Sequence, residues 1–222
     1  MKLTLKKILI SLTVLISIPV IAQKQLNYTD FGFAIGGIVH SGDVSNAGVG
    51  AFISDTRLQA KLNLKRTFAS WFTLGIEAGY GYLSAKDIDH GDAVRNYTVS
   101  THIIQVNPFI EINFSKFGKY RRDKSWTPYL KLGGGVLFYN PELDGNAVYP
   151  SFIELRPNAY TGFNFLIGLG AKIRTSYHSY LTLEPTIHFT NVDDLEGWRY
   201  NPNLSNNDVY GGFTIGYNYM IF

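Results

Sequence analysis

The chain has 222 residues and no cysteine, so neither a disulfide framework nor a thiolate metal site can support it. It also lacks a second long apolar run, because after residues 8–21 no stretch reaches the 18 apolar residues that indicate a membrane-spanning helix. The chain has no strong excess of one charge either, since it contains 20 Lys and Arg and 17 Asp and Glu. These absences exclude a disulfide-stapled scaffold and a transmembrane helix bundle, and they offer no basic surface for nucleic acid.

Residues 1–22 have the organisation of a secretory signal peptide. Three lysines precede the apolar run over residues 8–21, and Ala22 supplies the small residue before a cleavage site. The run is short for a transmembrane helix, which needs roughly 20 apolar residues. We expect cleavage after Ala22, which leaves residues 23–222 as one domain. Its formal charge is zero, because the +3 of the full chain is lost with the three lysines.

Glycine and aromatic residues are abundant, and apolar residues recur with a period of two. The segment 161–190 shows this period on both sides of a turn at residues 176–179. In its first half one parity is apolar and the other holds mainly small or polar residues; the apolar members are Phe163, Phe165, Ile167, Leu169, Ala171 and Ile173. A period of two is the period of a β-strand, so the segment is predicted to be a hairpin.

The same alternation predicts eight antiparallel strands. They cover residues 31–40, 58–65, 72–82, 104–114, 130–138, 163–173, 181–189 and 209–222. The connections after the second and sixth strands are short and the one after the fourth is medium, whereas the other four, around 41–56, 85–98, 141–160 and 191–208, are long. Short turns at one end and long loops at the other are typical of outer-membrane barrels. We therefore expect an all-β fold, an eight-stranded antiparallel transmembrane β-barrel in the outer membrane.

The two faces of these strands differ in charge. The apolar parity of the eight spans carries no charge, as expected for a face that contacts lipid. The polar parity carries a nearly balanced set of charges, which must be paired if they fill the interior of a small barrel. We predict an interior network of salt bridges and hydrogen bonds made of Lys61, Lys65, Glu77, Glu111, Lys131, Lys172, Glu184 and His188.

Aromatic residues near the strand ends predict two belts at the membrane interfaces. One belt, at the short-turn end, comprises Trp71, Trp126, Tyr177 and Tyr180; the other, at the long-loop end, comprises Tyr82, Tyr139 and Tyr160.

One local pattern invites an enzymatic interpretation. The stretch His188-Phe189-Thr190-Asn191 resembles the His-x-Ser-Asn of lipid A deacylase barrels, with a threonine in place of the serine nucleophile. A hydroxyl, an imidazole and a carboxylate make a hydrolase only when their geometry aligns. A hydrogen-bonded interior histidine is the favoured interpretation, so we expect no enzyme activity and assign no catalytic residue.

Two charged segments lie outside the strands. Asp193, Asp194 and Glu196 form an acidic cluster in the last long loop; calcium is one hypothesis, but without a known loop motif a solvated loop is favoured, and we expect no metal or cofactor. The medium connection carries a basic cluster that could dock an acidic periplasmic partner or anionic headgroups, with an ordinary solvated turn as the alternative. Its members are Lys116, Lys119, Arg121, Arg122 and Lys124.

Several short motifs resemble the small outer-membrane barrel of the type IX secretion and gliding machinery of Bacteroidetes, the PorG-like family. They are Gly36-Gly37 followed by Ser41-Gly42-Asp43, Thr127-Pro128-Tyr129 leading to Gly133-Gly134-Gly135, Phe138-Tyr139-Asn140-Pro141, Glu184 through Thr190 to Asp193-Asp194-Leu195, and Asp208-Val209-Tyr210. The resemblance implies a non-enzymatic component without cofactors that associates with the periplasmic ring of the apparatus. A lipid A-modifying barrel enzyme and a generic structural or adhesive barrel are the alternatives.

Overall fold

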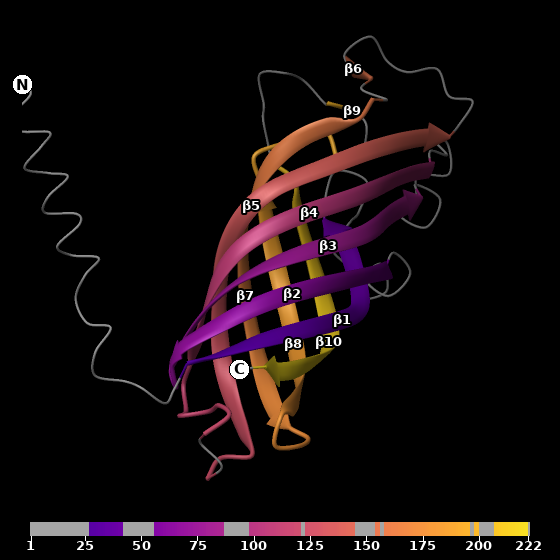
Figure 1. Cartoon of the computed structure of the whole chain (residues 1–222). Coiled ribbons are helices and arrows are strands. Elements are labelled where there is room, and N and C mark those ends of the chain that lie inside the picture. Colours follow the sequence, from indigo (N-terminus) through magenta and orange to yellow (C-terminus); the bar gives the residue numbers. More distant parts are fainter. Residues whose placement is uncertain are drawn as a thin grey trace, which may run out of the picture.

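Eight strands of the chain close into an antiparallel barrel (Figure 1). The computed structural model describes residues 27–41, 56–86, 98–120, 123–144, 154–155, 158–195, 198–199 and 207–221. The barrel strands are β1 (Tyr28–Ser41), β2 (Arg57–Ala69), β3 (Phe72–Lys86), β4 (Thr98–Asn113), β5 (Trp126–Asp144), β7 (Tyr160–Arg174), β8 (Ser179–Thr190) and β10 (Val209–Ile221). The order around the barrel is β1-β10-β8-β7-β5-β4-β3-β2, so the predicted all-β barrel of eight strands is confirmed. The proposed signal peptide and Phe222 lie outside the described residues.

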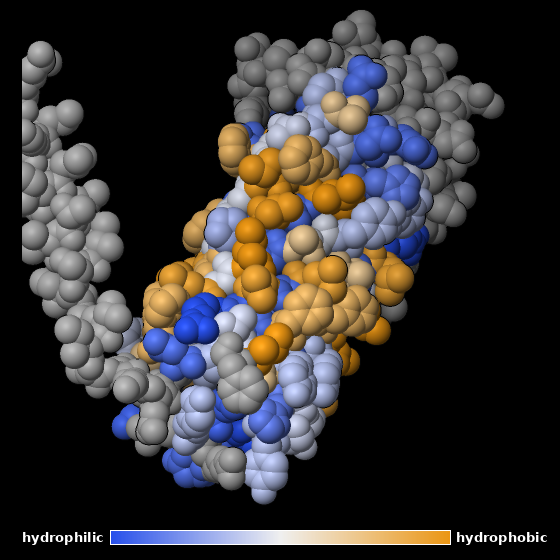
Figure 2. All heavy atoms as spheres, viewed as in Figure 1, coloured by the Kyte–Doolittle hydropathy of each residue, from blue (hydrophilic) through white to orange (hydrophobic). Residues whose placement is uncertain are grey.

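The period of two places apolar side chains on the outer surface. Along β7 the outward Phe163 and Phe165 are 63% and 49% exposed, whereas the intervening Asn164 is 6% exposed. Figure 2 shows the result as a hydrophobic band across the middle of the barrel wall, with hydrophilic surface at either end. Closure of the sheet pairs the backbone of every strand on both sides, which is what a β-structure needs in lipid. Among the described residues, no helix is long and apolar enough to cross a membrane.

The connections separate by length as the sequence predicts. Ser70 and Trp71 join β2 to β3, residues 114–125 join β4 to β5, and residues 175–178 join β7 to β8. These turns share one end of the barrel with the start of β1 and the end of β10, where Thr29 pairs with Ile221. We call this the short-turn end and the opposite one the long-loop end.

Two features of the wall differ from the sequence prediction. The strands are longer than the alternation indicates, because backbone pairing continues past the apolar band, as in the pairing of Lys86 with Thr98. In addition, β6 (Glu154–Leu155) and β9 (Trp198–Arg199) pair with each other within two long connections. Two residues are too few to show a period, so no pattern could have predicted them.

Phe109 occupies the space that glycines leave on both neighbouring strands. A Cβ atom on Gly75 of β3 would collide with the Phe109 ring, and a Cβ on Gly133 of β5 would lie 2.7 Å from the Phe109 Cβ. The register between β4 and β5 is interrupted just beside this ring, at Asn107 and Pro108. The glycines therefore allow one large aromatic side chain to fill the interior at an irregular point of the wall.

The predicted aromatic belts are wrong in part. Trp71, Trp126 and Tyr177 are exposed as an interface belt requires, but Tyr139 and Tyr180 are 3% and 1% exposed. Both have the inward parity of their strands and point into the barrel.

Outside the predicted spans, the outward face does carry charge. β2 continues to Ala69 beyond its predicted end, and this extension places the exposed Arg66 on the outward parity.

Candidate functional site: the filled barrel interior

Lys131 stands at the centre of a charged layer in the barrel interior. Its Nζ lies 2.5 Å from Glu77 Oε2 on β3 and 3.0 Å from Glu184 Oε1 on β8. Tyr129, also on β5, donates from its hydroxyl to Glu184 Oε2 at 2.6 Å. The Lys131 ammonium lies 4.3 Å from the centroid of the Phe109 ring, a cation–π distance. This lysine therefore joins three strands across the interior.

A second group of charges lies closer to the short-turn end. Glu111 accepts two ammonium groups, with Lys172 Nζ at 2.6 Å and Lys65 Nζ at 2.9 Å. Tyr180 donates from its hydroxyl to Asp30 Oδ2 at 3.0 Å. Asp30 is a buried acid that was not part of the predicted network. Asp30 is opposite Lys65 in the pairing of β1 with β2. With Asp30, four acids face four lysines in the interior.

All eight side chains of the predicted network lie in this interior, each at most 6% exposed. Lys61 joins it more loosely, with its Nζ 3.8 Å from Glu77 Oε1. His188 takes part through packing, because its ring stacks on Tyr210 with centroids 4.4 Å apart and planes 9° apart. Its Nδ1 has no hydrogen-bond partner among the described residues.

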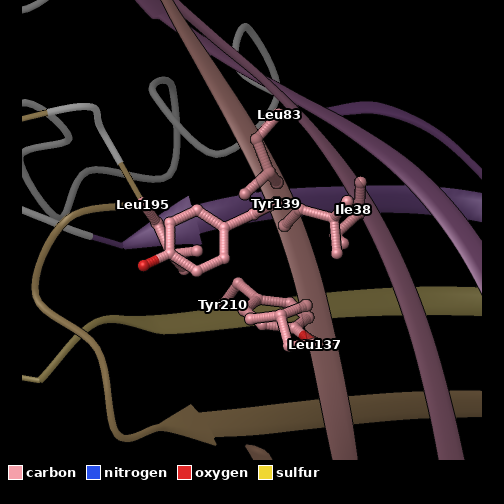
Figure 3. Close-up of a cluster of buried hydrophobic side chains, with 7 residues drawn as sticks. Ile38, Leu83, Leu137, Tyr139, Leu195 and Tyr210 are labelled. Atoms are coloured by element: carbon pink, nitrogen blue, oxygen red, sulfur yellow. The ribbon is translucent and has the colours of Figure 1, made fainter. Parts of the chain in front are cut away.

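A cluster of buried hydrophobic side chains lies in the interior at the long-loop end (Figure 3). We call it the outer seal; it consists of Ile38, Leu83, Ile103, Leu137, Tyr139, Leu195 and Tyr210. Six of these residues come from the strand walls, and Leu195 comes from the connection after β8. Leu195 is 1% exposed, so this loop enters the barrel mouth instead of lying over it.

Hydrogen bonds fix the loop in the mouth. The Leu195 amide donates to Asp208 Oδ2 at 2.9 Å, and the Thr101 hydroxyl donates to the Leu195 carbonyl at 2.6 Å. The Tyr139 hydroxyl donates to the carboxylate of Asp194. Thr190 donates from its hydroxyl to the Asp208 carbonyl at 2.7 Å. These contacts tie the two ends of the connection to each other and to β4 and β5.

The acidic cluster of this loop is divided by the insertion. Asp194 is buried, Asp193 is partly buried, and Glu196 lies outside the described residues. The expectation of a solvated loop is therefore wrong for Asp194. Across the described ranges, no three His, Cys, Asp or Glu side chains are grouped to hold a metal ion.

A second hydrophobic cluster, the inner seal, covers the charged layer at the short-turn end. It consists of Tyr28, Phe117, Tyr180 and Met220. Phe117 belongs to the connection between β4 and β5, and its ring meets Tyr180 edge to face at 5.6 Å. The Arg174 guanidinium lies 4.8 Å from the Phe117 centroid and donates to the Gly118 carbonyl at 2.7 Å. Gly118 has a φ of 152°, within the region that favours glycine.

The basic residues of the connection between β4 and β5 differ in exposure. Lys116 and Lys124 are exposed, but Lys119 is only 7% exposed. Arg121 and Arg122 lie outside the described residues. Of the three described members, Lys119 is therefore not part of an exposed docking surface, because it is buried near Phe117.

The interior is therefore a charged layer between two apolar seals. Paired charges in a space of low dielectric hold the strands at fixed distances, since separating a partner leaves the other buried and unpaired. Sequence reasoning missed Leu195 and Phe117 because both lie in connections without periodicity. A large apolar side chain next to polar loop residues was the only available signal.

A closed antiparallel barrel with an apolar outer wall, short turns at one end and long loops at the other defines an outer-membrane β-barrel protein. The family model described as "Outer membrane protein beta-barrel domain" matches residues 10–220, so the chain belongs to that family and to the outer membrane. The comparison with curated proteins finds no match.

Solved outer-membrane proteins are similar to this chain at low identity. A major outer membrane protein from Thermus thermophilus is 9% identical with a TM-score of 0.50, covering 87% of this chain and 99% of that chain. Neisserial surface protein A is 8% identical with a TM-score of 0.48, covering 87% and 96%. The outer membrane enzyme PagL is 17% identical with a TM-score of 0.43, covering 86% and 98%. At these identities the likeness concerns the fold alone.

Proposed function

We propose that this outer-membrane barrel is a non-enzymatic structural component of a type IX protein secretion system that associates with periplasmic ring proteins. The observation that carries the proposal is the filled interior, in which two apolar seals enclose paired charges. Such an interior favours a protein that acts through its outer surfaces. The motifs that resemble those of the secretion and gliding barrels are the reason for naming this machinery. The proposed role requires no cofactor and no nucleic acid.

The geometry around His188 supports the non-enzymatic part of the proposal. His188 is 1% exposed and stacks on Tyr210, with its ring facing the interior. The hydroxyl of Thr190 donates to the main-chain carbonyl of Asp208 and thereby holds the loop. A deacylase must bring its nucleophile to acyl chains, which lie against the outer wall of a barrel. Neither the His188 ring nor the Thr190 hydroxyl lies at the outer wall.

The short-turn end is the side that faces the periplasm, because turns of outer-membrane barrels are periplasmic and loops extracellular. The connection between β4 and β5 exposes Lys116, Lys124 and the half-exposed Tyr120 there. The two lysines give this face a positive potential that attracts an acidic partner, and aromatic side chains are enriched at protein contacts. We propose this face, without Lys119, as the contact with the periplasmic partners.

The test is purification of the tagged chain from native outer membranes, with partners identified by mass spectrometry. We expect periplasmic ring proteins to be enriched, and secretion of type IX cargo to fail when the chain is deleted. Replacement of both Lys116 and Lys124 by Glu is expected to reduce the co-purified ring proteins. The matched variant Glu142→Lys changes an exposed charge at the long-loop end and should leave them unchanged.

The alternatives give different outcomes. If secretion is normal without the chain while lipid A acylation changes, and His188→Ala abolishes that change, the lipid-modifying alternative replaces the proposal. Normal secretion and unchanged lipid A would favour the generic structural or adhesive barrel. Rescue of secretion by His188→Ala supports the structural role.

A further inference from the structure

The outward face of β2 carries a cation among apolar side chains. Arg66 is exposed and has the same parity as Leu64 and Phe68, which precede and follow it on the lipid-facing wall. These neighbours are 50% and 43% exposed, as expected for side chains in contact with lipid. On the β3 side, Arg66 pairs with Leu74, which is 41% exposed. Arg66 thus projects from an otherwise apolar part of the wall.

The guanidinium is held along the wall by a neighbouring strand. Arg66 Nη1 donates to Thr29 Oγ1 at 2.8 Å, and Thr29 is its direct partner in the pairing of β1 with β2. A lysine or arginine at such a site would ordinarily extend its charge toward water. Here the bond to Thr29 directs the charge sideways, so the guanidinium stays near the depth of its own backbone.

No carboxylate within the described residues neutralises Arg66. Each of the interior lysines in the charged layer has an acid within 3.8 Å, whereas Arg66 has only the threonine hydroxyl. The nearest acid in sequence on the paired strand, Asp30, has the inward parity and is 1% exposed. The remaining guanidinium donors therefore face the surrounding lipid.

The depth of Arg66 corresponds to a membrane interface. β2 ends at Ala69, and the exposed Trp71 lies in the turn that follows. With a rise of about 3.3 Å per residue and a tilt of about 45°, Arg66 lies only about 5 Å further into the membrane than Phe68. Phospholipid phosphates and glycerol groups occupy this zone.

We propose that Arg66 and Thr29 form a binding site for the phosphate of an anionic phospholipid in the periplasmic leaflet. A guanidinium binds phosphate with two parallel N–H donors, and its positive charge favours headgroups of net negative charge. The Thr29 hydroxyl accepts from Arg66 and has its own proton to donate to a second phosphate oxygen. The apolar side chains of Leu64 and Leu74 lie where the acyl chains of the same lipid would pack.

Electron paramagnetic resonance with spin-labelled lipids tests the site. The folded chain is reconstituted in phosphatidylcholine, and the association of labelled phosphatidylglycerol is compared with that of labelled phosphatidylcholine. Arg66→Leu is expected to reduce the preference for phosphatidylglycerol about fivefold, the factor for one basic residue near an anionic surface. Thr29→Val keeps the side-chain shape and is expected to give a smaller reduction, and Arg66→Lys an intermediate one.

Arg57→Gln is the matched control, because it removes one positive charge from the same strand, at the long-loop end of the barrel. It is expected to leave the preference unchanged. Heat-dependent gel mobility verifies that each variant is folded, and Arg66→Gln replaces Arg66→Leu if the latter does not fold. An unchanged preference in the Arg66 variants, or an equal loss in Arg57→Gln, overturns the site. So does loss of a co-purified protein from Arg66→Leu with lipid preference intact, since the ligand would then be a partner's carboxylate.

Discussion

The ammonium of Lys131 and the carboxylate of Glu77 lie 2.5 Å apart across the interior of the barrel, although 54 positions separate them in the chain. Glu184 completes the arrangement at 3.0 Å from the same nitrogen. One lysine therefore neutralises two buried acids from strands on different sides of β5. Lys131 thus joins two acids in the charged layer, as Glu111 joins two lysines.

Replacement of Lys131 by Met should therefore be strongly destabilising. The substitution keeps the length of the side chain but leaves Glu77 and Glu184 buried without their shared partner. Removal of one member of a buried ion pair costs about 3–5 kcal/mol. Urea unfolding in lipid bilayers, followed by tryptophan fluorescence, measures the loss.

Lys124→Met is the control for this prediction, because Lys124 is exposed in the turn before β5. Adding Glu77→Gln to Lys131→Met should restore part of the lost stability, since one uncompensated charge is removed with the lysine. An unfolding free energy for Lys131→Met equal to that of the wild-type chain would show that the layer is not electrostatically coupled.

The wall of the barrel is predictable because one physical constraint acts on every strand. Outward positions contact lipid and inward positions face a narrow interior, so Phe163 and Lys172 on β7 reveal their directions by parity alone. The charges of the inward parity had to be paired, so their parity alone made Lys131 and Glu77 members of the predicted network.

The seals could not be predicted in the same way. Tyr139 and Tyr180 have inward parity, but tyrosine is also typical of membrane interfaces. Both residues were therefore predicted to lie in the aromatic belts. Leu195 and Phe117 lie in connections, where no period indicates a direction. Arg66 was missed because the apolar alternation fades before β2 ends, whereas the backbone pairing continues.

Leu195 should control the protection of the loop that enters the barrel mouth. Leu195→Ala removes most of its contact with the outer seal, and a buried Leu→Ala substitution costs 2 kcal/mol or more. Since residues 191–195 lie outside the strands, we expect the loop to open locally, and a cost of about 2 kcal/mol then predicts about thirtyfold faster hydrogen exchange. Hydrogen exchange of the Thr190 and Leu195 amides is the measurement.

Leu58→Ala provides the comparison, because Leu58 lies near the same end of the barrel but is 73% exposed on the outer face. In Leu58→Ala the hydrogen-exchange rates of the Thr190 and Leu195 amides should equal those of the wild-type chain. Equal loop exchange in Leu195→Ala and wild type would mean that the outer seal does not retain the loop.

Phe117 should stabilise the short-turn end more than its position in a connection implies. The ring is 1% exposed between Tyr180 and the Arg174 guanidinium, so Phe117→Ala leaves a cavity in the inner seal. The expected loss is about 3–5 kcal/mol in the free energy of unfolding. The half-exposed Tyr120 lies in the same turn, and Tyr120→Ala should have little effect. Similar losses for both variants in urea unfolding would contradict the seal.

The glycine opposite Phe109 gives the most specific test of packing in the interior. A Cβ at position 75 would collide with the far end of the Phe109 ring, so Gly75→Ala should cost about 1–3 kcal/mol through overpacking. Because only the ring is in the way, Gly75→Ala should cost much less in a Phe109→Leu background. Unfolding free energies of the four chains give the coupling between the two sites.

Gly211→Ala separates this effect from the general loss of a glycine in a strand. A Cβ at Gly211 would lie 3.6 Å from the Thr186 carbonyl oxygen, which is an ordinary contact. This substitution should therefore leave the stability unchanged or raise it slightly, since alanine restricts the unfolded chain more than glycine does. If Gly75→Ala and Gly211→Ala changed stability alike, or if Phe109→Leu did not alter the cost at position 75, the ring would not fill the space that Gly75 leaves.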